Sequence, residues 1–167
     1  TLDASAGIYL DNVTLVEDTF NIQTVNRVDS AGRFFLSAQD IISLGKNVIF
    51  KGGFRYTHAG NLGRGYFEPR LSLTVNAGEN WKFNGAWGIY DQFIVKSTAV
   101  DDRGNYRYFW AVSDNKEIPV IRSSHLVFGT SFHRNGWTFS FEPFFKWIDG
   151  ITRYFYSSFL QWEGVLA

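Results

Sequence analysis

Long runs in which apolar and polar residues alternate dominate this sequence, and no run has the spacing of an amphipathic helix. Between Tyr66 and Ala77 the separation is almost complete, because the odd positions are apolar and the even positions are mostly polar. A period of two is the pattern of a β-strand with one apolar face. We therefore predict an all-β protein with about eight strands, at about residues 3–10, 14–27, 33–43, 47–58, 66–77, 81–90, 121–133 and 137–147.

The predicted connections alternate in length. Short turns rich in Gly and Asn are expected at 44–47, 77–80 and 133–136, and longer loops at about 28–33, 58–65 and 97–120. Short connections on one side and long ones on the other are typical of outer-membrane barrels. We predict an antiparallel transmembrane outer-membrane β-barrel. Pro69 and Pro143 fall inside predicted strands, and each predicts a local bulge.

The last predicted strand has a length that suits a bilayer. Trp137 and Trp147 share one face ten residues apart, which is roughly 33 Å at about 3.3 Å per residue, or roughly 25 Å at a strand tilt of about 40°. Between them that face is apolar and uncharged, and it carries Phe139, Phe141, Pro143 and Phe145. Because a charge at the bilayer midplane costs about 2 to 4 kcal/mol, we predict that Trp81, Trp137 and Trp147 form membrane girdles. The alternative is a soluble sandwich or lipocalin-like barrel whose aromatic face is its core.

Composition excludes several classes of protein. The 16 Lys and Arg balance the 16 Asp and Glu, so no basic field is present to bind nucleic acid. The absence of cysteine excludes a disulfide framework, a thiolate zinc site and a cysteine nucleophile. No run approaches the 18 apolar residues of a transmembrane helix. Several of the 31 aromatic rings instead fall on one face of the predicted strands.

Three segments, in order, resemble the barrel of TonB-dependent outer-membrane receptors of the SusC-like or siderophore-receptor type. The first is similar to a hairpin with a Gly-x-Arg-Tyr element, here Gly53, Arg55 and Tyr56. The second has Glu-Pro-Arg followed by a turn and an aromatic-Gly-x-aromatic-x-Gln element, here Glu68, Pro69, Arg70, Trp87, Gly88, Tyr90 and Gln92. The third resembles a later hairpin and carries His125, Gly129, Glu142, Phe145, Lys146, Asp149, Gly150, Thr152, Arg153 and Tyr154. The matches span about residues 33–155.

This resemblance implies a 22-stranded barrel around a plug domain, in the outer membrane of a Gram-negative bacterium. Residues 1–167 show no plug pattern, so the whole chain reads as a middle portion of a single barrel domain. The implied function is energy-coupled uptake of a scarce nutrient, such as a metal chelate or siderophore, a cofactor or an oligosaccharide. Implied partners are outer-membrane lipid, the substrate, the TonB energy-coupling complex acting through the plug, and a surface lipoprotein. The resemblance implies no resident cofactor.

Two groups of residues are candidates for substrate contact. Tyr106, Arg107, Tyr108 and Trp110 lie in the expected loop 97–120, where rings and a guanidinium are suited to stack on sugars or an aromatic siderophore. The alternative is that these rings form a hairpin above the barrel and pack on one another. The second group is expected on the lumen face and comprises Arg70, Tyr90 and Gln92. Lumen charges, with Glu68, Lys82, Glu142 and Lys146 among them, alternatively pair with each other or with a plug.

An enzyme is not expected. His58, His125 and His133 lack the spacing of metal ligands, and Glu142 and Asp149 are roughly 23 Å apart along a strand, too far for glycoside hydrolysis. We assign no catalytic and no metal-binding residue, because the loop acids match no calcium-binding pattern; they are Asp101, Asp102, Asp114 and Glu117. Two other functions stay open: a complete eight-stranded outer-membrane barrel with an adhesin or structural role, and a soluble lipocalin-like binder.

Overall fold

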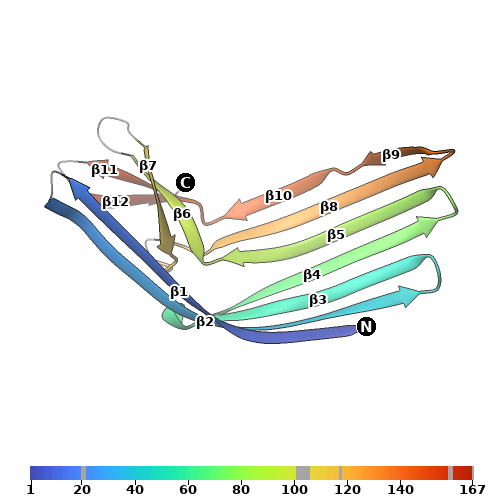
Figure 1. Ribbon diagram of the computed structural model, residues 1–167, viewed down its shortest axis with the longest axis horizontal. Helices are drawn as coiled ribbons and strands as arrows, with labels where there is room; N and C mark the ends of the chain where they lie inside the picture. Colours follow the sequence, from blue (N-terminus) through green and yellow to red (C-terminus); the bar gives the residue numbers. More distant parts are fainter. Residues whose placement is uncertain (20–21, 101–105, 117, 158–159, 167) are drawn as a thin grey trace.

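The chain is all-β in the computed structural model, which describes residues 1–19, 22–100, 106–116, 118–157 and 160–166 (Figure 1). Twelve strands lie in these ranges: β1 (Leu2–Thr19), β2 (Ile22–Leu44), β3 (Val48–Ala59), β4 (Arg64–Ala77), β5 (Trp81–Gln92), β6 (Ile94–Val100), β7 (Tyr106–Val112), β8 (Ile121–Arg134), β9 (Trp137–Phe141), β10 (Phe144–Asp149), β11 (Thr152–Ser157) and β12 (Leu160–Leu166). A single turn of 3-10 helix, η1 (Gly60–Leu62), joins β3 to β4. The described residues contain no helix that is long and apolar enough to cross a membrane.

The strands form two sheets. The large sheet has the order β1-β2-β3-β4-β5-β8-β10, with β9 also beside β8, and every pair in it is antiparallel. The small sheet has the order β12-β11-β6-β7 and contains one parallel pair, β11 with β6. The predicted all-β, antiparallel character is therefore confirmed for the large sheet. Its outer strands β1 and β10 are not paired with each other, so the described residues do not close a barrel.

The prediction of eight strands was wrong. β1 and β2 pair from Leu2 opposite Asp40 to Thr19 opposite Ile22, with one register shift between Glu17 and Asp18, so they run through the expected loop at 28–33. The expected loop 97–120 contains β7, which pairs with β6. Both hairpins extend beyond the end of β3 and β4 (Figure 1). The two strands of a hairpin form backbone hydrogen bonds with each other whether or not one face is apolar throughout, so the sequence of a hairpin need not alternate.

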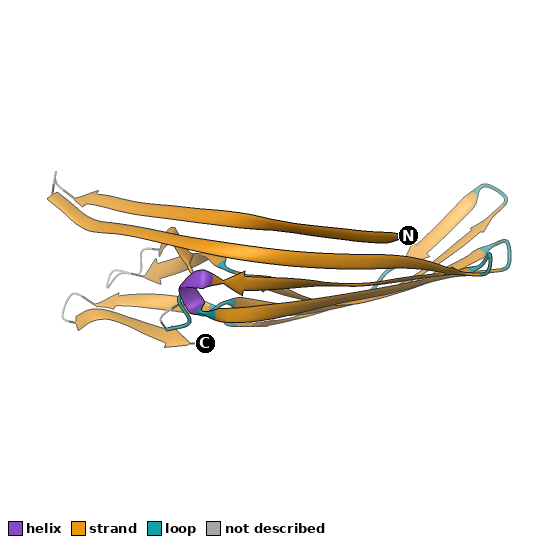
Figure 2. Cartoon of the chain, turned by 90° about the horizontal axis from the view of Figure 1, so that it is seen from below, coloured by secondary structure: helices purple, strands orange, loops and turns teal. Residues whose placement is uncertain are grey.

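The three predicted short turns are confirmed, and they gather at one end of the large sheet, whereas η1 lies at the other end of β3 and β4 (Figure 2). Their central residues have positive φ: Gly45 at 71°, Gly78 at 69°, Asn135 at 51° and Gly136 at 82°. Gly and Asn tolerate this left-handed backbone better than other residues. Turn chemistry was therefore readable from the sequence.

The predicted proline bulges are wrong, because the register does not change at either proline. Pro69 lies opposite Phe54 in a continuous β3–β4 ladder. On both sides of Pro143, β8 pairs with β9 and β10 in the same register. The Phe128 N–H still donates to the Pro143 carbonyl at 3.1 Å, but Pro143 has no N–H to return. The ladder therefore loses a bond there without gaining a residue, which separates β9 from β10.

One face of the large sheet is apolar and uncovered. Residues opposite each other in neighbouring strands share a face, so the register joins the apolar runs of β3, β4, β5, β8, β9 and β10 into one surface. On it Phe83 is 44% exposed and Phe141 is 69% exposed. A lipocalin-like or sandwich protein would bury this face as its core, and the structure instead leaves it open.

The small core of the described residues lies elsewhere, where β6, β7 and the segment 113–120 meet the rim of the large sheet. One cluster contains Val95, Ala111 and Ile118. A second contains Ala59, Tyr66, Phe93 and Val120, with Phe93 set edge-on to Tyr66 at 4.9 Å between ring centroids. The buried core therefore fixes the small sheet on the rim and does not stabilise the large apolar face.

Candidate functional site

The pairing of β4 with β5 stops at Arg70, opposite Gly88. Beyond this point β4 continues beside β3, and β5 continues beside β8. Alternate residues of a strand point their backbone groups at opposite neighbours. The Asn76 N–H donates to Asn47 on the β3 side, so the odd-numbered residues of β4, Pro69 among them, face β5. Because Pro69 has no N–H, it has nothing to donate to β5, and the two strands separate there.

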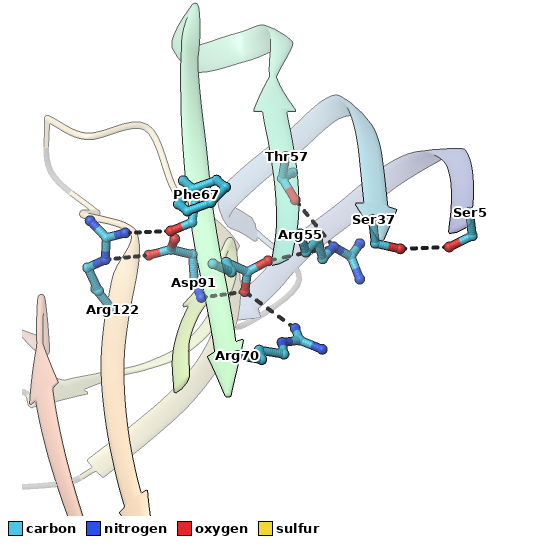
Figure 3. A network of polar contacts seen from close by, with 9 residues as sticks. Ser5, Ser37, Arg55, Thr57, Phe67, Arg70, Asp91 and Arg122 are labelled. Carbon is cyan, nitrogen blue, oxygen red and sulfur yellow. Dashed lines mark hydrogen bonds and ion pairs between the residues drawn. The ribbon is translucent and has the colours of Figure 1, made fainter. Parts of the chain in front are cut away.

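Side chains replace the backbone bonds lost at this separation. If the ladder continued, Phe67 and Asp91 would lie opposite each other. Instead, the Asp91 N–H donates to Glu68 Oε1 at 2.9 Å, and Arg122 Nη2 donates to the Phe67 carbonyl at 3.0 Å (Figure 3). Arg122 Nε also lies 3.4 Å from Asp91 Oδ1. The open end of the β4–β5 pair is thus closed by a carboxylate and a guanidinium.

Glu68 is also the centre of an arginine pair on the polar face. Its side chain is 5% exposed, and its two oxygens lie 3.6 Å from Arg55 Nε and 3.9 Å from Arg70 Nη2 (Figure 3). Rings hold the arginines from the other side: Arg55 lies 4.3 Å from the centre of the Phe35 ring, and Arg70 lies 4.8 Å from the centre of the Tyr90 ring. Both guanidinium groups are therefore fixed in position while their contacts with Glu68 stay longer than a strong hydrogen bond.

Two hollows lie on the polar face on either side of Arg70. The register places Arg70 between Gly53 of β3 and Gly88 of β5. A Cβ atom at Gly53 would lie 2.8 Å from the Ala38 carbonyl oxygen, and one at Gly88 would lie 3.0 Å from the Tyr90 hydroxyl. A side chain at Gly53 would therefore meet backbone, and one at Gly88 would displace the Tyr90 ring; as glycines, neither fills the space beside Arg70.

The hollow on the β5 side measures about 250 Å³, and its lining includes Gln39, Lys51, Arg70, Ser72, Tyr90 and His125. The hollow toward β1 measures about 340 Å³, and its lining includes Asp3, Ser5, Ser37, Gln39, Arg55 and Arg70. We call the first one the Lys51–Arg70 hollow. Two cations and no acid line it, whereas Asp3 faces the arginines in the second.

Two of the three predicted lumen residues come together. Arg70 and Tyr90 contact each other, and Tyr90 also stacks on His125 at 4.8 Å between ring centroids. Gln92 shares their face but lies at the end of β5, where its side chain donates to the Ile94 carbonyl at 2.7 Å. Glu68 and Arg70 form an ion pair at 3.9 Å, which agrees with the alternative that these charges pair with each other.

The predicted aromatic loop is the strand β7. Tyr108 and Trp110 are 63% and 54% exposed, and the Lys96 ammonium lies 4.8 Å from the centre of the Tyr108 ring. The side chains of Tyr106 and Arg107 lie outside the described part of the structure. The hairpin of the alternative prediction is therefore present, but the Tyr108 and Trp110 rings are exposed to solvent, and among the described residues they do not pack on each other.

The three tryptophans predicted to form girdles lie at the two ends of the apolar face. Trp81 and Trp137 adjoin short turns, Trp147 lies near the other end, and they are 45%, 69% and 56% exposed. One ladder row beyond Trp147, charges return at Asp149 and Arg122. At the turn end, Arg134 shares the row of Trp137. Between these two charged rows, the described parts of β3, β4, β5, β8, β9 and β10 place no Asp, Glu, Lys or Arg on this face.

One charge departs from the pattern, on β2. Asp40 lies on the apolar face, opposite Gly52. Its carboxylate accepts the Ile41 N–H at 2.8 Å. The sequence pattern of β2 had shown this exception, because Asp40 interrupts an otherwise apolar alternation.

Sequence reasoning missed several residues of the site, namely Gln39, Lys51, Arg55, Ser72 and His125. All five lie at the polar positions of their strands, and the sequence shows this much. The sequence does not show which polar residues line the same hollow, because that depends on the register between strands. The acids considered for calcium give no site: Asp114 Oδ1 accepts the N–H groups of Lys116 and Ile118 in a turn. Asp101, Asp102 and Glu117 lie outside the described residues. Within the described ranges, no three metal-binding side chains cluster.

No model of a protein family matches the chain, and no curated protein matches its sequence. The resemblance to TonB-dependent receptors over residues 33–155 therefore stays a prediction.

Proposed function

We propose that this chain is part of the wall of an outer-membrane β-barrel of the TonB-dependent receptor type, with lipid on its apolar face and the lumen on its polar face. The observation that carries the proposal is the single-layer antiparallel sheet whose charge-poor aromatic face is exposed between tryptophans at its two ends. Such a sheet needs a second apolar phase to cover it, and a bilayer supplies one.

The size of the apolar face supports a bilayer. Together with the residues of β1 and β2 on the same side, the described part of this face carries about twenty large apolar side chains, each at least about a third exposed. At about 50 to 100 Å² each, they expose on the order of 1,000 Å² or more. The largest apolar patch on a soluble monomer is about 300–600 Å². Moving 1,000 Å² of apolar surface from water into hydrocarbon is favourable by about 25 kcal/mol. A face of this size is therefore expected to be covered by an apolar phase in the native protein.

The stagger of the short turns supports a tilted barrel wall. Along the ladder, the turn between β8 and β9 lies three to four residues beyond the turn between β2 and β3, across four strand spacings. If the turns share one level, this corresponds to a strand tilt of roughly 30°. With tilts of about 30° to 40°, the ten residues from Trp137 to Trp147 rise by roughly 25 to 28 Å, close to the apolar height of an outer-membrane barrel.

The directions of the edge strands favour a larger barrel over a complete small one. Six antiparallel steps lead from β1 to β10, so these two strands run in the same direction. Closing the large sheet on itself would require a parallel pair, whereas bacterial outer-membrane barrels are antiparallel with an even number of strands. The eight-stranded adhesin or structural barrel is therefore the weaker candidate.

The transport part of the proposal rests on the family resemblance and on the polar face. Arg70 and Tyr90 line a hollow on the side that would face the lumen. Tyr108 and Trp110 present exposed rings on the hairpin beyond the rim, where a substrate would first arrive. These groups suit a metal chelate, a cofactor or an oligosaccharide, taken up with energy from the TonB complex.

Deleting the gene in its host tests this function. We expect loss of uptake of one nutrient class, tested as chelated iron, a corrinoid and an oligosaccharide. Uptake in the parent strain should stop when the proton-motive force is collapsed, because energy coupling depends on it. If the parent strain carries the protein in its outer membrane and the deletion strain still takes up all three classes normally, the transport role is contradicted. The adhesin or structural alternative is then favoured.

A further inference from the structure

The Lys51–Arg70 hollow has a charge character that the rest of the polar face lacks. Across the described residues, the polar face carries both signs, and most of its arginines have an acidic neighbour: Arg33 pairs with Asp11 at 2.6 Å, and Arg55 faces Glu68. Lys51 makes no ion pair within the described ranges. It lines the hollow with Arg70, and no acid joins them there.

Arg70 keeps donors available for a ligand. Its only acidic neighbour among the described residues, Glu68, approaches no closer than 3.9 Å, and that carboxylate already accepts the Asp91 N–H. The centre of the Tyr90 ring lies 4.8 Å from the guanidinium carbon, and an aromatic ring beside a guanidinium does not use up its N–H donors. The Arg70 side chain is 43% exposed, so these donors reach the hollow.

The space beside Arg70 is built into the backbone. Gly88, opposite Arg70, lets the Tyr90 ring fold back beneath the guanidinium, since any Cβ there would lie 3.0 Å from the Tyr90 hydroxyl. The remaining wall supplies neutral hydrogen-bonding groups from Gln39 and Ser72. An opening of about 250 Å³ with two cations and these polar groups suits a small anion with several oxygens.

We propose that the Lys51–Arg70 hollow binds a small oxyanion ligand, one that carries carboxylate or phosphate groups, with Arg70 as the bidentate anchor and Lys51 as the second charge. The inference rests on the proposed function in one respect, because it places an anionic group of the substrate on the lumen face. It does not require transport, a plug or energy coupling, so binding is measurable without them.

Calorimetric titration of the intact protein in detergent tests the site, with pyrophosphate and citrate as probes and maltose as the neutral comparison. We expect one or both anions to bind at 50 mM salt, maltose not to compete, and binding to weaken at 300 mM salt because screening weakens charge pairing. Citrate binding alone would indicate a carboxylate ligand, and pyrophosphate binding alone a phosphate ligand.

Three variants complete the test. Arg70→Gln should weaken binding at least about tenfold, and Lys51→Gln about threefold to tenfold. Lys82→Gln, on the same face but far along β5, should leave it unchanged. Because Lys51 makes no ion pair among the described residues, Lys51→Gln is not expected to disturb the fold. If Arg70→Gln does disturb it, the anion affinity of Lys51→Gln tests the site. Absence of anion binding in the parent protein, or equal binding in Lys51→Gln and the parent, overturns the site without affecting whether the protein lies in the membrane.

Discussion

Glu68 Oε1 lies 2.9 Å from the backbone nitrogen of Asp91, and this bond crosses the point where β4 and β5 stop pairing. Pro69 removes the backbone donor that would have extended the ladder. The adjacent carboxylate then accepts an N–H group that would otherwise be left without a partner inside the sheet. In the Glu-Pro sequence, Pro69 therefore ends the β4–β5 ladder, and Glu68 accepts the Asp91 N–H that this leaves without a backbone partner.

Glu68→Ala should destabilise the intact protein by about 2 to 3 kcal/mol, because it orphans the Asp91 N–H and leaves two arginines without their shared anion. Urea unfolding in lipid vesicles measures this. Glu68→Gln keeps an acceptor oxygen and should cost about 1 kcal/mol. Equal losses for the two variants would mean that the hydrogen bond to Asp91 contributes nothing.

Pro143→Val should stabilise the sheet relative to Pro69→Val. The register at Pro143 is unchanged, and its nitrogen faces β8, so a restored N–H meets the Phe128 carbonyl and adds about 0.5 to 1.5 kcal/mol. The nitrogen of residue 69 faces β5 where the strands have separated, so it gains no such bond. The loss of proline rigidity is common to both variants. If the two are equally stable, the ladder gap at Pro143 has another cause.

Asp40→Leu should raise stability in a bilayer by about 1 to 2 kcal/mol, because this carboxylate lies on the face assigned to lipid. The same change on a water-exposed face would be close to neutral. Unfolding measured in lipid vesicles distinguishes the two. A loss of stability would show that the Asp40 carboxylate makes a needed contact and that β2 is not lipid-facing at this level.

Phe141→Arg and Ser140→Arg place the same charge on opposite faces of β9. Phe141 lies between the levels of Trp137 and Trp147, so arginine there should cost about 2 to 4 kcal/mol in a bilayer. Ser140 lies on the polar face, where arginine should cost less than about 1 kcal/mol. Urea unfolding of both variants in vesicles gives the difference. Similar costs at the two positions would remove the distinction between the faces.

The sequence predicted the strands that share the large sheet better than it predicted the hairpins. In β4 and β9 one face is apolar, so alternation reports the face directly. Much of the β1–β2 pairing lies beyond the rim, where alternation carries little signal. The strands β6 and β7 span only seven residues each, which is too short for a clear alternating pattern. The predicted bulges at Pro69 and Pro143 were wrong because a proline only removes an N–H donor from the ladder. Losing a donor does not require the extra residue that defines a bulge.

The candidate site was predictable only in part. Arg70 and Tyr90 were assigned correctly to one face because parity decides the face of a strand residue. Their neighbours Gln39 and Lys51 come from other strands, and they reach the same hollow only through a register that links positions more than 15 residues apart. A single sequence contains turn signals and parity, but it does not give these cross-strand distances.

Membrane accessibility along residues 137–147 tests the central claim most directly, because the chain has no cysteine and each introduced cysteine carries the only label. Spin labels on the intact protein in lipid vesicles would be exposed to oxygen, which partitions into lipid, and to a water-soluble nickel chelate. We predict that labels at Phe139, Phe141 and Phe145 favour oxygen, whereas labels at Ser140, Phe144 and Lys146 favour the chelate or neither reagent. Equal access to the chelate at both sets of positions would contradict the assignment of the apolar face to lipid.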